Sequence, residues 1–245
     1  MRRREFIKYG TTAGLLALGL DRVIGPSAGA QPPSVTIDLD IVEAMFELVD
    51  GRRVFVLAYR PVAGAATVPG PAVEIHDDEA VSFRVTNRTG SPHGLAVPGI
   101  NGAWPGIVVA PGATEVLGPF STVRAGSYMY ADPVDHPVNR VLGLHGGLIV
   151  LPRNGTTPYG SPTPAVQRLF DDLGDAGRGF PGDGWTEPRL TPNGRSWLWV
   201  LNSIDPRFNR RAERGRRIDP VDMIDRFRPR YFTINGLSGP HAVHD

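Results

Sequence analysis

The sequence predicts an all-β protein built as a sandwich or barrel of short strands. The chain of 245 residues contains 30 glycines and 24 prolines, and this composition favours frequent turns over long helices. Several segments also alternate apolar and polar residues with a period of two, which is the pattern of a strand that buries one face. Aromatic and charged residues make up 8% and 21% of the chain, ordinary values for a protein with a packed core.

The first strands are predicted in the N-terminal third of the chain. Residues 34–41 carry apolar side chains at every odd position from Val35 to Ile41, with mostly polar residues between them. Asp50 and Gly51 separate this region from an apolar run at residues 54–59. An Asp-Gly pair between apolar runs predicts a hairpin with a tight turn, because such a turn needs positive φ. Residues 81–86 alternate again and predict another one-sided strand.

Four more strands are predicted at residues 106–110, 114–117, 127–131 and 147–151, with glycine- or proline-containing breaks between them. Short strands at this spacing are typical of a sandwich or barrel. We therefore place one β-domain at residues 34–152.

The rest of the chain is expected to be a linker followed by an unfinished domain. Residues 153–195 are dense in glycine, proline and aspartate, with one short helix expected after Thr163 and Pro164. Residues 196–245 contain two predicted strands, at residues 197–201 and 231–234, and a short helix from Asp219-Pro220. A second sandwich needs roughly seven strands and on the order of 100 residues, so residues 196–245 are expected to form only its incomplete start.

Residues 1–30 resemble a twin-arginine signal peptide. Arg3 and Arg4 precede Phe6, Ile7 and Lys8 in the spacing of that signature. An apolar run at residues 10–20 is too short to span a bilayer, and residues 28–30 (Ala-Gly-Ala) offer a small-residue cleavage site. The alternatives are a basic N-terminus that stays attached and a general secretory signal. The twin-arginine interpretation predicts a periplasmic or secreted protein with no membrane span in its mature chain.

Charge and cysteine content exclude several classes of function. Residues 1–30 hold five basic and two acidic residues, which leaves 21 basic against 23 acidic residues, a formal charge of −2. No basic surface for nucleic acid is therefore predicted for the mature chain as a whole. The sequence contains 0 cysteines, so disulfides, thiolate metal sites and cysteine nucleophiles are excluded.

Several motifs follow one another in a fixed order in the β-domain. Residues 68–75 form a Pro-Gly-Pro turn that leads into a strand, and residues 81–87 form a strand that ends in Thr-Asn. Residues 91–94 read Ser-Pro-His-Gly, residues 125–130 read Ala-Gly-Ser-Tyr-Met-Tyr, and residues 142–150 read Leu-Gly-Leu-His-Gly-Gly-Leu-Ile-Val. Together they resemble the first cupredoxin (plastocyanin-like) domain of the multicopper oxidase family. Residues 231–236 resemble the start of a second cupredoxin domain.

This resemblance implies a cupredoxin-like Greek-key β-sandwich, copper as a cofactor and an oxidoreductase activity. It also implies a type 1 copper site with one cysteine and two histidines, and a three-copper cluster that takes two His-x-His pairs from the first domain. The chain departs from that pattern, because it has no cysteine and the first pair reads Ser91 and His93. The second pair falls on residues 131–133 (Ala-Asp-Pro), which contain no histidine. The resemblance is therefore to a degenerate and truncated oxidase.

His93 is the candidate metal ligand, since it alone matches a ligand position of the family. The alternative is a loop histidine that is hydrogen-bonded to a backbone carbonyl. His145 lies in a glycine-rich strand, where packing is the expected role, and His136 is expected in a solvated loop. Asp132 and Asp135 could relay protons near a copper cluster, although turn chemistry is the preferred interpretation of Asp132-Pro133.

Three further histidines have weaker claims. His76 belongs to an acidic turn with residues 77–79 and is expected to be exposed. His241 and His244 lie near the C-terminus at a spacing of three, where they could bind metal if that segment is helical.

Three functions are compatible with the sequence. The chain is either part of a multicopper-oxidase-like system in which a partner supplies the type 1 copper, or a non-catalytic cupredoxin-fold module for binding or assembly. A copper carrier that uses His93 with His136 or His145 is the third. The expected partners are a second copy of the chain or a second cupredoxin chain that supplies the missing copper ligands.

Overall fold

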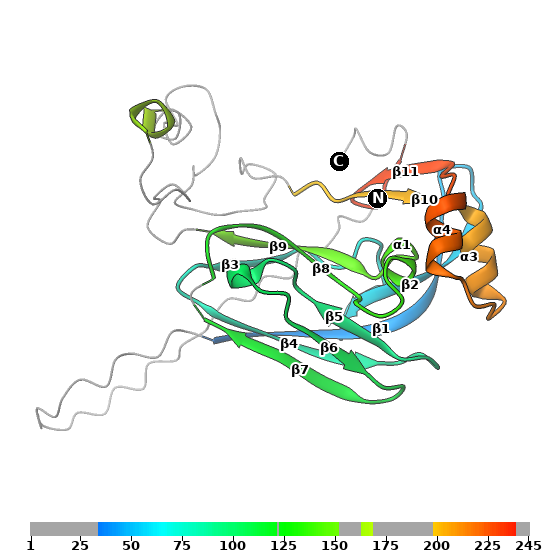
Figure 1. The fold of residues 1–245 in the computed structure, drawn as a ribbon, viewed down its shortest axis with the longest axis horizontal. Coiled ribbons are helices and arrows are strands. Elements are labelled where there is room, and N and C mark those ends of the chain that lie inside the picture. The colour runs from blue at the N-terminus through cyan, green and yellow to red at the C-terminus, as the bar shows by residue number, and fades with distance from the viewer. Residues whose placement is uncertain (1–33, 122, 152–162, 169–197, 239–245) are drawn as a thin grey trace, which may run out of the picture.

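The computed structural model describes residues 34–121, 123–151, 163–168 and 198–238 (Figure 1). In these residues the strands are β1 (Ser34–Glu47), β2 (Arg53–Pro61), β3 (Val73–His76), β4 (Ala80–Asn87), β5 (His93–Ala96), β6 (Gly106–Val109), β7 (Thr114–Phe120), β8 (Gly126–Ala131), β9 (His145–Leu151), β10 (Leu201–Ile204) and β11 (Tyr231–Ile234). The helices are the 3-10 turn η1 (Ile100–Gly102), α1 (Val138–Val141), α3 (Pro206–Glu213) and α4 (Pro220–Arg226). Residues 164–168 are also helical.

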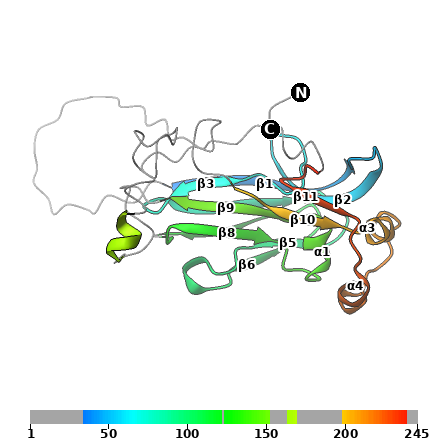
Figure 2. The ribbon, with the colours of Figure 1, turned by 90° about the horizontal axis from the view of Figure 1, so that it is seen from above.

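Nine of these strands form two sheets that pack face to face. The first sheet has the order β2-β1-β4-β7 and the second the order β3-β9-β8-β5-β6 (Figures 1 and 2). Most neighbours are antiparallel, but β1 pairs with β4 and β3 pairs with β9 in parallel. Crossovers between distant strands are typical of a Greek-key sandwich rather than of a simple meander. The predicted all-β sandwich is confirmed.

The core lies between the two sheets and is apolar and aromatic. Ile37 and Phe83 come from the first sheet, and Tyr130 and Leu148 come from the second; each is at most 1% exposed. The rings of Phe83 and Tyr130 touch across the interface, with centroids 5.8 Å apart. Buried side chains sit at alternate positions in the first half of β1 and in β3, where the period-two pattern of the sequence reports this core directly.

The turn between β1 and β2 is longer than the tight turn predicted at Asp50-Gly51. The two strands pair as far as Glu47 and Arg53, so five residues connect them. Gly51 does take a positive φ of 77°, while Arg52 N–H bonds back to Asp50 Oδ1 at 3.1 Å. The Asp-Gly signal located the turn correctly, but Leu48 N–H bonds to Arg52 O at 2.8 Å and closes a wider loop.

Beyond the sandwich, β10 and β11 form a separate two-stranded antiparallel sheet, here called the ribbon. Its strand β11 matches the prediction, but β10 begins at Leu201, where the prediction for residues 197–201 ended. The cause is Asn235, whose Oδ1 accepts Val200 N–H at 2.9 Å and whose Nδ2 donates to Leu198 O at 2.8 Å. The Asn235 side chain therefore forms hydrogen bonds with the N–H of Val200 and the carbonyl of Leu198. These backbone groups would bond to a neighbouring strand if β10 began earlier.

Two short helices lie at one end of the sandwich, next to the ribbon (Figure 1). Asp219 caps α4 by accepting the N–H of Val221 at 2.8 Å, as its Asp-Pro sequence predicts. Asp205 caps α3 in the same way; this helix was not predicted, although its Asp-Pro sequence carries the same signal. Asn209 of α3 donates to Phe55 O at 2.7 Å and fixes the helix on β2.

No helix in the described part of the chain is both long enough and apolar enough to cross a lipid bilayer.

Candidate functional site

A buried cluster of three polar side chains lies where β5, β8 and α1 meet. His93 is the first residue of β5, Asp132 directly follows β8, and Asn139 belongs to α1. The pairing of Ala96 with Ala131 holds β5 beside β8 and brings Asp132 close to the start of β5. All three side chains are less than 9% exposed, so their polar atoms depend on one another for hydrogen bonds.

Asp132 is the centre of this cluster, here called the His93 cluster. Its Oδ2 lies 2.8 Å from His93 Nδ1 and 3.1 Å from Asn139 Nδ2. Its Oδ1 accepts backbone N–H groups from Gly94 at 3.1 Å and from Val134 at 2.7 Å. The predicted turn role of Asp132 is confirmed by the Val134 bond, but the carboxylate also satisfies three other donors. At 1% exposure it has no access to water as a substitute partner.

The geometry assigns the hydrogen-bond role of His93 Nδ1. A carboxylate oxygen only accepts, so His93 Nδ1 carries the hydrogen and donates it to Asp132. Asn139 Nδ2 lies 3.3 Å from the same nitrogen but does not bond to it. Its two hydrogens are donated to Asp132 Oδ2 and, at 2.9 Å, to Val134 O. The alternative proposed from the sequence was that His93 bonds to a backbone carbonyl. That prediction is wrong, because the partner of His93 is the carboxylate of Asp132.

The backbone next to the cluster is tightly packed. A Cβ atom at Gly94 would lie 2.1 Å from Ile107 O on β6, so only glycine fits there. The hydroxyl of Tyr59 donates to Gly94 O at 2.5 Å. Burial, with the negative charge of Asp132 as a smaller cause, raises the pKa of Tyr59 well above its usual value. Tyr59 therefore stays protonated and serves as a fixed donor.

His145 is buried separately, on β9 opposite Ala131. Its Nδ1–H donates to Arg140 O at 3.0 Å, and its buried Nε2 has no hydrogen-bond partner. Burial lowers the pKa of this imidazole to about 4, although the bond to Arg140 O acts in the opposite direction. The packing role predicted for His145 fits this position, because the ring is neutral and enclosed.

His145 gives a prediction for the pH dependence of stability. Its folded-state pKa lies below the unfolded value of about 6.5, so the unfolded chain takes up a proton that the folded chain refuses. The stability contributed by the neutral ring is present above pH ~6.5 and is lost as pH falls towards 4. We expect a loss of about 2 kcal/mol at pH 5 relative to pH 8. Urea unfolding of wild type and His145→Asn at both pH values measures it.

Asparagine keeps a donor for Arg140 O but does not titrate, so His145→Asn should remove about 2 kcal/mol of the pH dependence. Equal pH dependence in the two proteins would contradict the assignment. All other titrating groups are common to both proteins and cancel in the comparison.

The other predicted residues in the described part of the chain do not join either histidine. His136 and Asp135 are exposed, as expected for a solvated loop, and Asp135 takes a positive φ of 47°. His76 is half-buried at the end of β3, so its predicted position in an exposed turn is wrong. His76 is a residue of a strand and not of a turn, because β3 pairs with β9 as far as His76 opposite Leu151. His241 and His244 lie outside the described residues.

These residues do not fit a complete copper centre. A blue copper site needs a thiolate and two imidazoles, and the chain has no cysteine. Within the described ranges, no group of three or more His, Asp or Glu side chains is arranged to hold a metal ion. His93 Nδ1 is already bonded to Asp132, which leaves Nε2 as the nitrogen with which His93 could bind a metal. The role of His93 as a ligand stays a prediction.

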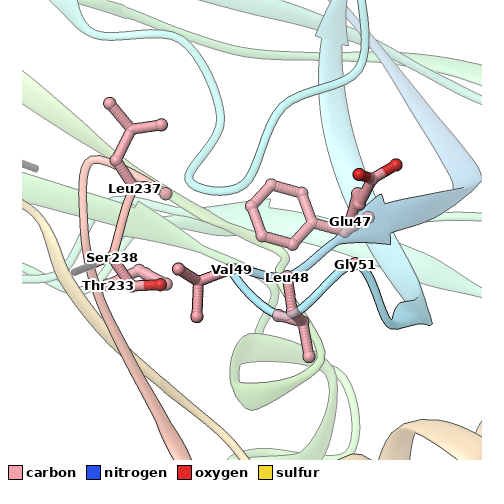
Figure 3. Close-up of a pocket in the computed structure, with 9 residues that line it drawn as sticks. Glu47, Leu48, Val49, Gly51, Thr233, Leu237 and Ser238 are labelled. Atoms are coloured by element: carbon pink, nitrogen blue, oxygen red, sulfur yellow. The ribbon is translucent and has the colours of Figure 1, made fainter. Parts of the chain in front are cut away.

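A shallow hollow of about 410 Å³ lies elsewhere, between the β1–β2 turn and the end of β11. Figure 3 shows Thr233, Leu237 and Ser238 on one side of it and Leu48 and Val49 on the other. Thr233 Oγ1 is buried there without a partner. The residues that line the hollow include none of the predicted site residues, and Glu47 is the one charged side chain among them.

Asn139 is not among the residues predicted from the sequence. It follows Pro137 and Val138 in a segment with no motif, and nothing in its spacing relates it to His93, 46 positions earlier. The usable signal was weak: a single asparagine near an Asp-Pro turn.

No protein-family model matches the chain, but curated proteins and solved structures do. The chain is 32% identical over 133 residues to a copper-containing nitrite reductase of Rhizobium sullae, a match that covers 51% of this chain and 34% of that protein. It is 30% identical over 111 residues to a copper-containing nitrite reductase of Alcaligenes xylosoxydans xylosoxydans, covering 42% and 33% respectively. The chain thus spans about a third of the length of these relatives.

Among solved structures, the blue copper oxidase of Nitrosomonas europaea has a similar fold, with a TM-score of 0.58 at 21% identity. The match covers 84% of this chain and 55% of that one. The sandwich alone, residues 34–151, is less than half of the chain, so the match is not confined to it.

Proposed function

We propose that this cupredoxin-type chain, a relative of copper-containing nitrite reductases and similar in fold to a blue copper oxidase, is an exported binding or assembly module of a copper oxidoreductase system. The predicted cupredoxin-like fold and the resemblance to copper oxidoreductases are confirmed by these similarities. The observation that carries the proposal is the His93 cluster. A blue copper site needs a thiolate and two imidazoles, whereas this cluster offers a single imidazole, whose Nδ1 is bonded to Asp132, and the chain has no cysteine.

Copper is the cofactor that the relatives imply, and His93 is the residue of the sandwich that would contact it. With Nδ1–H held by a carboxylate, the imidazole has the tautomer in which Nε2 is the metal ligand. One imidazole makes a weak site, so the other ligands would come from another polypeptide. Copper held in this way would supply electron transfer; the chain's own residues supply the fixed ring and the surrounding scaffold.

Export is the second part of the proposal. Its support is the order of three features in residues 1–30: the arginine pair, the short apolar run and the small-residue cleavage site. A twin-arginine route carries proteins in the folded state, which suits a chain of this type, and it would deliver the protein to the periplasm.

Copper analysis of the purified mature chain tests the proposal. We expect less than one copper per chain after dialysis against a weak chelator, no blue colour, and no oxygen uptake above background with a chromogenic phenol. A ligand that binds only the folded state must stabilise it. Because we expect the chain alone to hold no copper tightly, its melting temperature should stay unchanged when copper is added. His241→Ala/His244→Ala serves as the control that removes copper held by the C-terminal histidines.

Two results would decide for the other functions. One tightly held copper with phenol turnover would establish an autonomous oxidase. A copper-dependent rise of a few degrees in melting temperature, lost in His93→Ala but kept in the control, would establish a copper carrier.

A further inference from the structure

A cleft lined by three arginines lies between the start of β2 and helix α3. It has a volume of about 290 Å³. Residues 52–55 line one wall, and Pro206, Arg210 and Glu213 of α3 line the other. Asn209 Nδ2 of α3 donates to a backbone carbonyl of β2 at 2.7 Å, so a hydrogen bond holds the two walls together. We call this space the basic cleft.

The arginines of the basic cleft are not neutralised inside the protein. On α3, Arg207 and Arg211 are each held by an aspartate at 2.6 Å. Arg210 lies between them in the sequence, yet no ion pair in the described part of the chain involves it. The same holds for Arg52 and Arg53 on the opposite wall. Three guanidinium groups therefore remain available to an anion from outside.

The acidic side chains near the cleft do not cancel this charge. Asp50 accepts a tyrosine hydroxyl at 2.6 Å through one oxygen and a backbone N–H at 3.1 Å through the other. Glu47 lies opposite Arg53 in the register of β1 and β2, but the ion pairs of the described residues do not include this one. Glu213 lines the cleft itself. Three arginines against one glutamate leave the lining with an excess of two positive charges.

The positive charge continues beyond the cleft. Residues 206–230 contain nine arginines and four acidic residues, whereas the rest of residues 31–245 holds 12 basic and 19 acidic residues. Arg214, Arg216 and Arg217, just after α3, are all exposed. Basic residues are thus concentrated at the end of the sandwich where α3 and α4 lie (Figure 1).

The dipole of α3 explains only part of this arrangement. Basic residues near the C-terminal end of a helix are stabilised by the helix dipole, which accounts for Arg210 and Arg214. Arg52 and Arg53 belong to the β1–β2 turn and to β2, not to a helix. They bring two more positive charges to the wall opposite Arg210. Like charges repel one another, and an anion between them relieves that repulsion.

The lining also indicates the class of anion. A guanidinium group donates two parallel hydrogen bonds to a carboxylate or a phosphate. Val54, Phe55 and Pro206 add apolar surface, which suits the carbon body of an organic acid better than inorganic phosphate. The exposed arginines beside the cleft favour a chain with several carboxylates over a small single acid. The acidic residues interleaved in residues 206–230 and the net negative charge of the mature chain count against nucleic acid.

We propose that the basic cleft binds an acidic segment of a partner polypeptide, whose aspartate or glutamate carboxylates pair with Arg52, Arg53 and Arg210. The inference rests on the proposed function in one respect, since it names the chemistry of the partner that a binding or assembly module recognises. Its test uses no copper, so the two proposals can fail separately.

Fluorescence anisotropy of a labelled peptide of alternating glutamate and glycine, titrated with the full mature chain, tests this proposal. We expect micromolar binding at low salt and at least about tenfold weaker binding at roughly 0.5 M salt, because salt screens exposed charges. The matching peptide of glutamine and glycine should not bind. Arg210→Gln and Arg53→Gln should each weaken binding about three- to tenfold. Glu213→Gln should tighten it, since it removes the acid that lines the cleft.

Arg124→Gln is the matched control. Arg124 is exposed and its substitution removes the same charge, but it lies between β7 and β8, outside the cleft. The affinity of this variant for the peptide should stay within about twofold of wild type. Far-UV circular dichroism confirms that each variant is folded.

A wild-type chain that does not bind the glutamate peptide would overturn the proposal. So would equal weakening in Arg124→Gln and Arg210→Gln, because binding would then follow net charge alone. Succinate or inorganic phosphate that competes as well as the peptide would assign the cleft to a small anion. A DNA oligonucleotide of equal charge that binds more tightly through Arg210 would assign it to nucleic acid. Either result would contradict an acidic polypeptide as the partner.

Discussion

Replacing Asp132 by alanine is expected to destabilise the sandwich by about 3–5 kcal/mol, because it removes the shared acceptor of a buried cluster. His93 Nδ1–H and Asn139 Nδ2 lose their carboxylate partner, and the N–H groups of Gly94 and Val134 lose theirs. Asp132 is 1% exposed, so bulk solvent does not reach these donors in the folded protein. Thermal unfolding followed by circular dichroism should show a melting temperature lower by on the order of 10–20 °C.

Two control variants separate this effect from a general loss of charge. Asp132→Asn keeps one oxygen for the two backbone donors and should cost less than half as much. Asp135→Asn changes a neighbouring exposed carboxylate at a positive φ that asparagine tolerates, and should cost less than about 0.5 kcal/mol. If Asp132→Ala unfolds at the same temperature as Asp135→Asn, the His93 cluster is not a structural centre of the domain.

The double variant Asp132→Cys/Asn139→His is expected to turn a colourless protein blue when Cu(II) is added. Asp132 Oδ2 and Asn139 Nδ2 lie 2.8 and 3.3 Å from the same atom, His93 Nδ1. A thiolate and a second imidazole in their places give the donor set of one cysteine and two histidines that binds copper in blue sites. Freed from Asp132, His93 Nδ1 has a lone pair for the metal. The measurement is the visible absorption band of a copper thiolate, with copper counted per chain.

The control for this reconstruction is Asp132→Ser/Asn139→His, which has the same imidazoles without a thiolate and should stay colourless. Copper should also raise the melting temperature of the cysteine variant, since it binds the folded state. A folded variant with a titratable thiol that binds copper without the thiolate band would show that the three side chains do not converge as described.

Local patterns in the sequence predicted most of the strands, because burial on one face imposes a period of two that needs no knowledge of partners. Strand β11 and helix α4 lie where the pattern and the Asp-Pro cap place them. The prediction of β10 failed for a non-local reason. Asn235, more than thirty residues later, bonds to the backbone of residues 198 and 200, and no local pattern contains that information.

The residues of the His93 cluster also differ in whether a local sequence pattern could predict them. His93 was identified from its motif and the turn role of Asp132 from the Asp-Pro sequence, both local signals. Their contact joins positions 39 residues apart and depends on how β5 and β8 pair. Asn139 could not be found, because its role exists only once α1 has brought it beside Asp132.

The parallel pairing of β3 with β9 also bears on how the protein is made. Residues 73–76 find their partners only at residues 148–151, so the ribosome must complete most of the chain before the second sheet can close. Contacts so distant along the chain slow folding, and they leave the earlier strands without their neighbours during synthesis. The nascent polypeptide therefore reaches its final shape only after translation has passed β9.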